Sequence, residues 1–455
     1  MCEVDKMLYR KVQKDIEQWL NDGHDALLIT GARQVGKSFL IRETLKKNKI
    51  NYVEFNFIQN PNLLEIFNSA LKNDSDRFLM ELEVASNKNL TKDTVIFFDE
   101  IQECKEIVTI IKFLVENGKY KYVLSGSLLG VELRDLRSAP VGYMRTIEMF
   151  PMDLEEFLIA NKLSEKILNY LKDCFDKKLQ VSDFIHTRLI DAFYKYLIVG
   201  GMPEAVDAFI RTNDLNEVST IHKKIWQDYK KDFTRYEGKY KLKLISIYDL
   251  IPAELNSKNK RYNFSNINKQ LKFARYENNF NWLIDAGVSI PVFNVTEYQI
   301  PLEASKKSNL FKLFLSDVGM LTTFYGSATI LKLLDNGNDV NCGAMFENAI
   351  AQELKAHGFK EYYFNNKKHG EVDFLIEYNN QLLPIEVKSG KDYQKHSALS
   401  YFMSTNRFDN AFVLSNYNVK VENNITYYPI YMIMFIHSNF KINDKVSLNL
   451  DDIQI

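Results

Sequence analysis

The sequence predicts an α/β multidomain protein, and three observations support that prediction. Residues 1–155 alternate short β-rich runs with helical stretches, which is the pattern of a parallel sheet covered by helices. Residues 155–240 have a mostly helical pattern, and the chain after about 305 returns to a helix followed by several strands. A chain of 455 residues is also long enough for about three domains of ordinary size.

The composition is that of a folded protein without an excess of either charge. Hydrophobic residues make up 46% and charged residues 26%, which excludes wholesale disorder. Lys and Arg number 58 against 59 Asp and Glu, so the chain as a whole is no polycation built to coat nucleic acid. The four cysteines form no CxxC pair, and the N-terminus has no apolar signal segment. We therefore expect a cytoplasmic protein with no membrane segment.

Five apolar runs predict the strands of the first domain. Residues 26–29 are continuously apolar, as expected for a strand buried on both faces. Val53, Phe55 and Phe57 alternate with polar residues, which indicates a second strand. We expect further strands at residues 95–98, 122–124 and 145–149.

Residues 31–38, with the sequence GARQVGKS, match the phosphate-binding pattern G-x-x-x-x-G-K-[ST] in full. The match follows a buried strand and opens a helical stretch, which is the context that the pattern requires. Its glycines let backbone N–H groups face phosphate oxygens, while Lys37 would neutralise the β- and γ-phosphates and Ser38 would hold Mg²⁺. We predict that ATP is bound by Gly31, Ala32, Arg33, Gln34, Val35, Gly36, Lys37, Ser38 and Phe39.

A second motif, formed by two acidic residues, follows the apolar run at 95–98. Asp99 would emerge at the C-terminal edge of a buried strand, where it can hold Mg²⁺, and Glu100 would polarise the attacking water. Asp99 lies 62 residues after Lys37 (99 − 37), which leaves room for an intervening strand and helix. The alternative is an ordinary turn at the end of a strand.

Ser125 and three arginines complete the candidate nucleotide site. Ser125 either senses the γ-phosphate or simply forms a turn between strand and loop. Arg134, Arg137 and Arg145 are candidates for an arginine finger that reaches the γ-phosphate of a neighbouring subunit, which would require a homo-oligomer. We prefer Arg145 because it begins a strand near the same sheet edge. The alternative for each is a solvated surface arginine.

Five motifs occur in order along the chain: GARQVGKS (31–38), FDEIQ (98–102), LSGS (124–127), FPMDLEEF (150–157) and GGMPE (200–204). As a set they resemble the prokaryotic AAA-type P-loop ATPases that carry a C-terminal domain of unknown function. The resemblance implies a P-loop NTPase core with a parallel sheet, a helical lid, a winged-helix-like segment and a C-terminal α/β nuclease-like domain. With boundaries placed on this sequence, these parts cover residues 1–155, 156–240, 241–305 and 306–455. The chain departs from the usual family pattern around 140–145, where a Gly-Arg pair is common.

A carboxylate and lysine pattern with the spacing D-x12-E-x-K lies within residues 370–388. Glu386 and Lys388 share one face of a strand, and a hairpin would bring Asp373 beside them. Two carboxylates would hold a divalent cation, and the lysine would orient a water or stabilise developing charge. The pattern resembles that of PD-(D/E)XK nucleases, and Glu347 on the preceding helix is a fourth candidate. The alternative is a solvated strand face with an i, i+2 ion pair.

Residues 221–276 concentrate positive charge, with 14 Lys and Arg against 5 Asp and Glu. Aromatic residues interleave with these cations, an arrangement that would suit phosphate contacts and base stacking, so DNA is a candidate partner here. These aromatic residues are Tyr229, Tyr236, Tyr240, Tyr262, Phe264, Phe273 and Tyr276. The alternative is a solvated helical surface, or a face docked on acidic parts of the same chain. Helices ahead of an apparent hairpin at 287–295 indicate the winged-helix-like segment.

The sequence therefore predicts an AAA-type ATPase that binds ATP and Mg²⁺, hydrolyses ATP, and engages DNA or another partner through its C-terminal region. Two alternatives stay open. One is a non-enzymatic, nucleotide-gated regulator or scaffold, and the other is a metal-dependent nuclease controlled by ATP.

Overall fold

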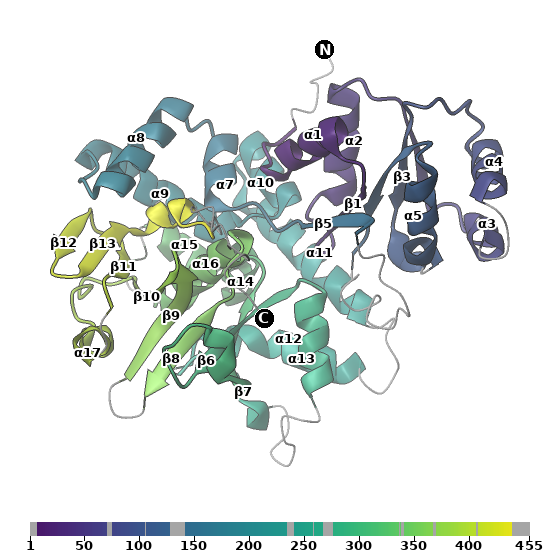
Figure 1. The fold of residues 1–455 in the computed structure, drawn as a ribbon. Coiled ribbons are helices and arrows are strands. Elements are labelled where there is room, and N and C mark those ends of the chain that lie inside the picture. Colours follow the sequence, from purple (N-terminus) through teal and green to yellow (C-terminus); the bar gives the residue numbers. More distant parts are fainter. Residues whose placement is uncertain are drawn as a thin grey trace, which may run out of the picture.

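The computed structural model of the chain contains two β-sheets with helices between them, one sheet in blue and the other in green and yellow (Figure 1). This architecture confirms the α/β multidomain class. The structure describes residues 7–70, 75–104, 106–127, 142–233, 241–257, 259–266, 276–335, 337, 341–366, 370–405 and 408–438.

The first sheet has five parallel strands in the order β2-β3-β4-β1-β5. The expected strands all form, within a few residues of their predicted bounds. Because the strands are parallel, their carboxyl ends share one edge, and the loop after β1 lies at that edge. The strands are β1 (Ala26–Thr30), β2 (Tyr52–Asn56), β3 (Val95–Asp99), β4 (Lys121–Ser125) and β5 (Met144–Glu148).

Helices cover both faces of this sheet because successive side chains of a strand point to opposite faces. Leu27 and Ile29 of β1 pack in the same core as α1 and α2, whereas Ala26 and Leu28 pack in the core formed with α3, α4 and α5. The helices are α1 (Val12–Asp22), α2 (Lys37–Lys47), α3 (Leu63–Ala70), α4 (Ser75–Ser86) and α5 (Glu106–Asn117), with the 3₁₀ turn η1 (Ile101–Glu103) between β3 and α5.

Further helices follow β5, and several of them lie between the two sheets (Figure 1). Among the described residues, no helix combines the length and the apolar character needed to cross a membrane. The helices that follow β5 are α7 (Leu154–Ala160), α8 (Glu165–Lys177), α9 (Asp183–Val199), α10 (Pro203–Thr212), α11 (Leu215–Phe233), α12 (Lys241–Leu255), α13 (Glu277–Asp285), α14 (Val318–Tyr325), α15 (Ser327–Leu334), α16 (Gly343–Ala356) and α17 (Ser397–Thr405), with 3₁₀ segments η3 (Phe264–Asn266), η5 (Leu302–Ser305) and η6 (Ile430–Phe435).

The GGMPE motif forms the turn between α9 and α10. Gly200 ends α9 with φ of +67°, a conformation that L side chains rarely adopt. The N–H group of Gly201 donates to Asp317 at 2.6 Å, and a Cβ at Gly201 would lie 2.0 Å from the carbonyl oxygen of Met152. The two glycines are therefore required by close packing between three segments that are far apart in sequence.

The second sheet has eight strands in the order β12-β13-β11-β10-β9-β8-β6-β7. It mixes parallel and antiparallel pairs, with β9 and β10 forming the hairpin expected around the carboxylate pattern. The strands are β6 (Ser289–Val295), β7 (Lys306–Leu315), β8 (Tyr362–Asn366), β9 (Gly370–Tyr378), β10 (Gln381–Lys388), β11 (Ala411–Ser415), β12 (Lys420–Glu422) and β13 (Ile425–Pro429).

The expected hairpin within residues 287–295 is wrong. Residues 289–295 form the single strand β6, which pairs antiparallel with β7 and parallel with β8. The strands expected to form a separate wing are therefore part of the second sheet. The predicted boundary at 305 falls between two paired strands, because the polar segment after β6 is a connection within the sheet and not a domain linker.

Helix α16 lies at the centre of the molecule, and every described residue from Ala344 to Leu354 is buried. Its polar side chains bind other segments from within the core. The Oε1 atom of Glu353 accepts hydrogen bonds from the Leu154 N–H group at 2.8 Å and the Tyr196 hydroxyl at 2.9 Å. Burial raises the pKa of Glu353 to about 7, and the negative charge of Asp153 contributes. Glu353 thereby joins α16 to α7 and α9.

We expect Glu353→Ala to lower the free energy of unfolding by about 2 kcal/mol, because it leaves the buried N–H group of Leu154 without an acceptor and removes one of the two acceptors of the Tyr196 hydroxyl. Glu353→Gln keeps an acceptor oxygen at this position and should cost clearly less. Urea unfolding at pH 8 compares the two variants with the wild type. Equal stability of the alanine variant and the wild type would show that Glu353 does not join these helices.

Candidate functional site

The loop at residues 31–38 runs from the end of β1 into the first turn of α2. Gly31 has φ of +133°, and a Cβ there would lie 2.1 Å from the carbonyl oxygen of Met149. Gly36 has φ of +91° and precedes the first residue of α2. Both glycines are needed for the tight path that brings the backbone N–H groups of the helix N-terminus to the loop.

Lys37 lies inside this loop and is 8% exposed. Its ammonium group donates to the carbonyl oxygens of Gly31 at 3.0 Å and Ala32 at 2.7 Å. Burial lowers the pKa of Lys37 to about 8, although the carboxylates of Glu100 and Asp99 act in the opposite direction. The loop therefore holds a buried cation whose charge an anion would stabilise.

Asp99 ends β3 directly beside the loop, as its position after an apolar strand predicts. Its Oδ1 atom accepts hydrogen bonds from the hydroxyl groups of Ser38, at 2.6 Å, and Ser125. Its Oδ2 atom accepts from Asn56 at 2.9 Å and lies 3.3 Å from Arg42. The structure thus brings Ser38, Asp99 and Ser125 together.

Sequence reasoning missed Asn56 and Arg42, although a signal for each was present. Asn56 is the last residue of β2, and the carboxyl ends of parallel strands share one edge. Arg42 follows Ser38 by four residues on the same helix, so both side chains lie on one face. Arg42 also forms two hydrogen bonds with Glu54, at 2.8 and 2.7 Å, which fix its guanidinium group beside Asp99.

Glu100 follows Asp99 in a left-handed backbone conformation, with φ of +60°. Its Oε2 atom accepts a hydrogen bond from the side-chain amide of Gln102 at 2.5 Å, and the side-chain Oε1 atom of Gln102 accepts from the backbone N–H of Ser127 at 3.2 Å. Glu100 lines a cavity of about 150 Å³ together with Lys37, Ser38 and Asp99. This cavity contains the residues with which a phosphate group and its cation would make contact.

A second cavity, of about 360 Å³, adjoins the first and shares Gln34, Gly36 and Phe39 with it. This cavity could not be predicted from sequence patterns, because its walls come from separate parts of the chain. The remaining lining residues are Met7, Leu8, Arg10, Leu40, Met149, Pro203, Glu204 and Asp207.

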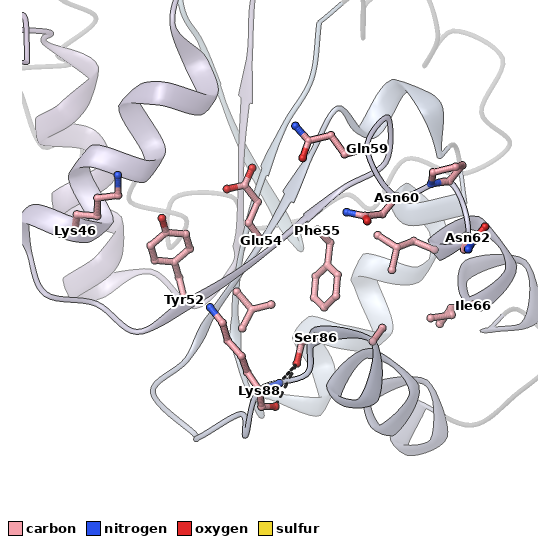
Figure 2. A pocket seen from close by; sticks show the side chains of 14 residues that line it. Lys46, Tyr52, Glu54, Phe55, Gln59, Asn60, Asn62, Ile66, Ser86 and Lys88 are labelled. Carbon is pink, nitrogen blue, oxygen red and sulfur yellow. Dashed lines mark hydrogen bonds between the residues drawn. The ribbon is translucent and has the colours of Figure 1, made fainter. Parts of the chain in front are cut away.

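A larger cavity, of about 780 Å³, lies along β2 at the edge of the first sheet. Figure 2 shows Tyr52 and Glu54 of this strand together with Lys46, Asn60 and Lys88. The cavity includes no residue of the phosphate-binding loop and neither acid of the β3 motif. Size alone therefore does not locate the candidate site, and the geometry of the loop does.

The arginine preferred as a finger lies away from the loop. Arg145 is on β5 opposite Leu27, is 49% exposed, and pairs with Asp25 at 3.3 Å. Asp25 lies just before the start of β1, whereas the loop follows the end of β1. Arg145 is therefore near the amino ends of the strands, and the loop is at their carboxyl ends. The reason for preferring Arg145 is therefore wrong, while a role in a neighbouring subunit stays a prediction. Arg134 and Arg137 lie outside the described residues.

Helix α11 contacts the loop through three side chains. Arg33 pairs with Asp232 at 2.6 Å, and Gln34 donates to Asp228 at 3.0 Å. The Tyr229 hydroxyl donates to the backbone carbonyl of Arg33 at 3.0 Å. Arg33 and Gln34, which were predicted to contact nucleotide, thus have side chains bound to α11.

The predicted C-terminal set comes together on α16, β9 and β10. The backbone N–H of Val387 donates to Asp373 at 2.9 Å, and Lys388 pairs with Glu386 at 2.7 Å. Burial raises the pKa of Asp373 well above its ordinary value, and the charge of Glu386 adds to the effect. Glu347 is 3% exposed and lies within the core, not on a solvated face.

Two lysines that the sequence did not indicate also belong to this cluster. Lys312 of β7 is fully buried and lies 3.2 Å from Glu347. Burial would lower the pKa of Lys312, but the surrounding carboxylates, Glu347 first, raise it above its ordinary value. Lys260 pairs with the second oxygen of Glu347. Both lysines precede the D-x12-E-x-K pattern by more than 50 residues, so spacing within the pattern could not reveal them.

The described part of residues 221–276 does not have the exposed aromatic surface that base stacking needs. Tyr229, Tyr262 and Tyr276 are at most 4% exposed, so a stacking role for them is wrong. Phe264 packs edge-on against Phe280, while Tyr236, Tyr240 and Phe273 lie outside the described residues. Several lysines of this segment pair with acids of the same chain: Lys224 with Glu204, Lys230 with Asp249 and Lys231 with Asp228.

Comparison with known families identifies the first of three regions. A family model described as an AAA domain matches residues 23–158. The matched residues include the loop at 31–38 and Asp99. Two further models, each described as a domain of unknown function, match residues 190–330 and 342–433. None of the curated proteins matches the chain.

Several solved structures are similar to the chain at low identity. A Walker-type ATPase of Pyrococcus abyssi has 15% identity and a TM-score of 0.42, with 70% of this chain and 96% of that chain covered. AMPPCP-bound DnaA of Aquifex aeolicus has 11% identity, a TM-score of 0.29 and coverage of 56% and 76%. The RuvB Holliday junction branch migration motor of Thermotoga maritima has 14% identity, a TM-score of 0.28 and coverage of 61% and 87%.

We expect Arg33→Ala and Asp232→Asn to show a coupling energy of about 1 kcal/mol in a double-mutant cycle, because one partner of this pair is buried and the other half-exposed. The measurement is the free energy of unfolding of both single variants and the double variant. The exposed pair Lys177 and Asp173 on α8 is the control, and its coupling should be smaller than that of Arg33 and Asp232 because solvent screens it. Additive effects at Arg33 and Asp232 would show that this ion pair does not contribute to the contact between α11 and the loop in solution.

Proposed function

We propose that the chain binds ATP with Mg²⁺ in the loop at residues 31–38 and hydrolyses it. The observation that carries the proposal is the hydrogen bond between Ser38 and Asp99, since it places a cation-binding hydroxyl and a carboxylate beside a buried lysine. In this role Lys37 binds the β- and γ-phosphates, and Ser38 and Asp99 hold Mg²⁺ and its water shell. Mg²⁺ supplies neutralisation of phosphate charge when it is bound.

Glu100 is the group that would orient and polarise the attacking water. Its side chain is held by Gln102, which is in turn bound to the loop after β4, so its position depends on the segment that contains Ser125. The adjoining cavity of about 360 Å³ is the proposed base site. Its apolar walls, including Leu40 and Met149, suit the faces of an adenine ring.

We expect Lys37→Ala to weaken ATP binding at least about tenfold, because it removes a buried charge-assisted contact to phosphate. Glu100→Gln should keep ATP binding and lower the hydrolysis rate about 100-fold or more, as loss of a general base does. Calorimetry and phosphate release measure the two effects. Lys46→Ala, an exposed position on the same helix, is the control. Unchanged hydrolysis in both site variants would disprove the proposed chemistry.

We also expect ATP affinity to fall above pH 8. In the nucleotide-free protein Lys37 loses its proton near that pH, whereas bound phosphate favours the charged form, so binding above pH 8 takes up a proton. Affinity should then decrease by up to about tenfold per pH unit. Lys37→Arg keeps its charge over this range and should give a flat profile. A profile equally flat in the wild type would contradict the assigned role of Lys37.

A nucleotide-gated regulator or scaffold is a second candidate, and the contacts of α11 favour it. Arg33 pairs with Asp232, and Gln34 donates to Asp228. A nucleotide that binds either side chain would therefore alter the contact between the loop and α11. Tight ATP binding without turnover in the wild type would favour this function over hydrolysis.

Other parts of the proposal rest on the sequence alone. They are the domain boundaries at 155 and 240, an arginine finger in a homo-oligomer, and engagement of DNA or a protein by the C-terminal region. Neither the buried tyrosines nor the paired lysines of residues 221–276 support DNA binding by that segment. A comparison of ATPase rates with and without DNA at two salt concentrations tests this part.

A further inference from the structure

The carboxylate cluster of the second sheet has an internal cation at its centre. The ammonium group of Lys312 lies 2.6 Å from Glu371, 3.2 Å from Glu347 and 3.9 Å from Asp373. Its side chain is 0% exposed, so these contacts are shielded from bulk solvent. A single positive group therefore touches carboxylates from α16 and β9, where the D-x12-E-x-K pattern leads one to expect a divalent metal.

The remaining oxygens of these carboxylates have protein partners as well. Glu347 binds Lys260 with its other oxygen, and Glu371 accepts from Asn365 at 2.6 Å. The Oδ2 atom of Asp373 accepts from the backbone N–H of Val387 at 2.9 Å. Glu347 and Glu371 thus use both of their oxygens in close contacts within the protein, while Asp373 uses Oδ2 and holds Oδ1 3.9 Å from Lys312.

Glu386 is the acid that retains a free oxygen. Its Oε1 atom pairs with Lys388 at 2.7 Å, while Oε2 is buried without a hydrogen-bond partner. Mg²⁺ and Mn²⁺ take about six ligands, mainly oxygens. Among the described residues, no group of three or more His, Cys, Asp and Glu side chains is arranged to hold a metal ion. The residues present do not fit a divalent cation.

We propose that Lys312 is the resident cation of this cluster and takes the place of a divalent metal. The charges balance within the protein, since Lys312 and Lys260 face Glu347 and Glu371 while Lys388 faces Glu386. Both central lysines precede residue 342, and the carboxylates follow it. Buried ion pairs therefore join Lys260 and Lys312 to the carboxylates of α16 and β9. Metal-dependent cutting of DNA is therefore not the function of the C-terminal region.

The test is Mn²⁺ binding by the full-length chain without nucleotide, measured as free Mn²⁺ by electron paramagnetic resonance. We expect the wild type and Asp373→Asn to bind the same amount of Mn²⁺, because this cluster binds none. Any Mn²⁺ bound near Ser38 and Asp99 is common to both proteins and cancels in the comparison. A Mn²⁺ ion that the wild type binds and Asp373→Asn loses would overturn the proposal.

Replacement of Lys312 tests the same proposal in the other direction. Lys312→Ala frees oxygens of three carboxylates and should add a Mn²⁺ site, which Lys312→Ala with Asp373→Asn should remove again. Loss of a buried partner charge destabilises a protein strongly, so Lys312→Ala requires a check of folding by circular dichroism. If it does not fold, the comparison of the wild type with Asp373→Asn decides the question by itself. A folded Lys312→Ala variant without the added site would also overturn the proposal.

Discussion

The hydrogen bond between Ser38 and Asp99 is the contact on which the candidate site depends. It joins the first turn of α2 to the end of β3, and these two elements meet because β4 alone separates β3 from β1 in the sheet. Parallel pairing brings the ends of all three strands to one edge. The positions of Ser125, Asn56 and Lys37 follow from the same arrangement, so strand order and site geometry have one physical cause.

The motifs outside the phosphate-binding loop connect the site to the rest of the molecule. Arg10 donates to the carbonyl of Val35 at 2.9 Å and pairs with Glu156 of the FPMDLEEF motif at 3.1 Å. Asp153 of that motif caps α7, and the next residue donates its N–H to Glu353. Backbone and buried side chains therefore form a continuous set of contacts from the loop to the central helix α16. In the GGMPE motif, glycine allows the close approach that these contacts need.

The second sheet illustrates how a catalytic pattern and a catalytic site differ. Asp373, Glu386 and Lys388 take the positions on β9 and β10 that their spacing predicts. The chemistry of the cluster depends on Lys312 as well, which arrives on a strand from an earlier part of the chain. A buried ammonium group among these acids changes what they can bind. The position of Lys312 therefore bears more on what this cluster can bind than the fold of the second sheet does.

The sequence alone determined the local features of this protein. A continuous apolar run such as residues 26–29 predicts a buried strand. In the GARQVGKS loop, the glycines permit the backbone conformations that the tight turn requires. Tertiary structure decided which distant residues meet. It placed Arg42 beside Asp99, assembled the second cavity from separate segments, put Arg145 at the far edge of the sheet and set Lys312 among the C-terminal carboxylates. The physical reason is that patterns of spacing encode neighbours within one element, whereas packing between elements fixes contacts across hundreds of residues.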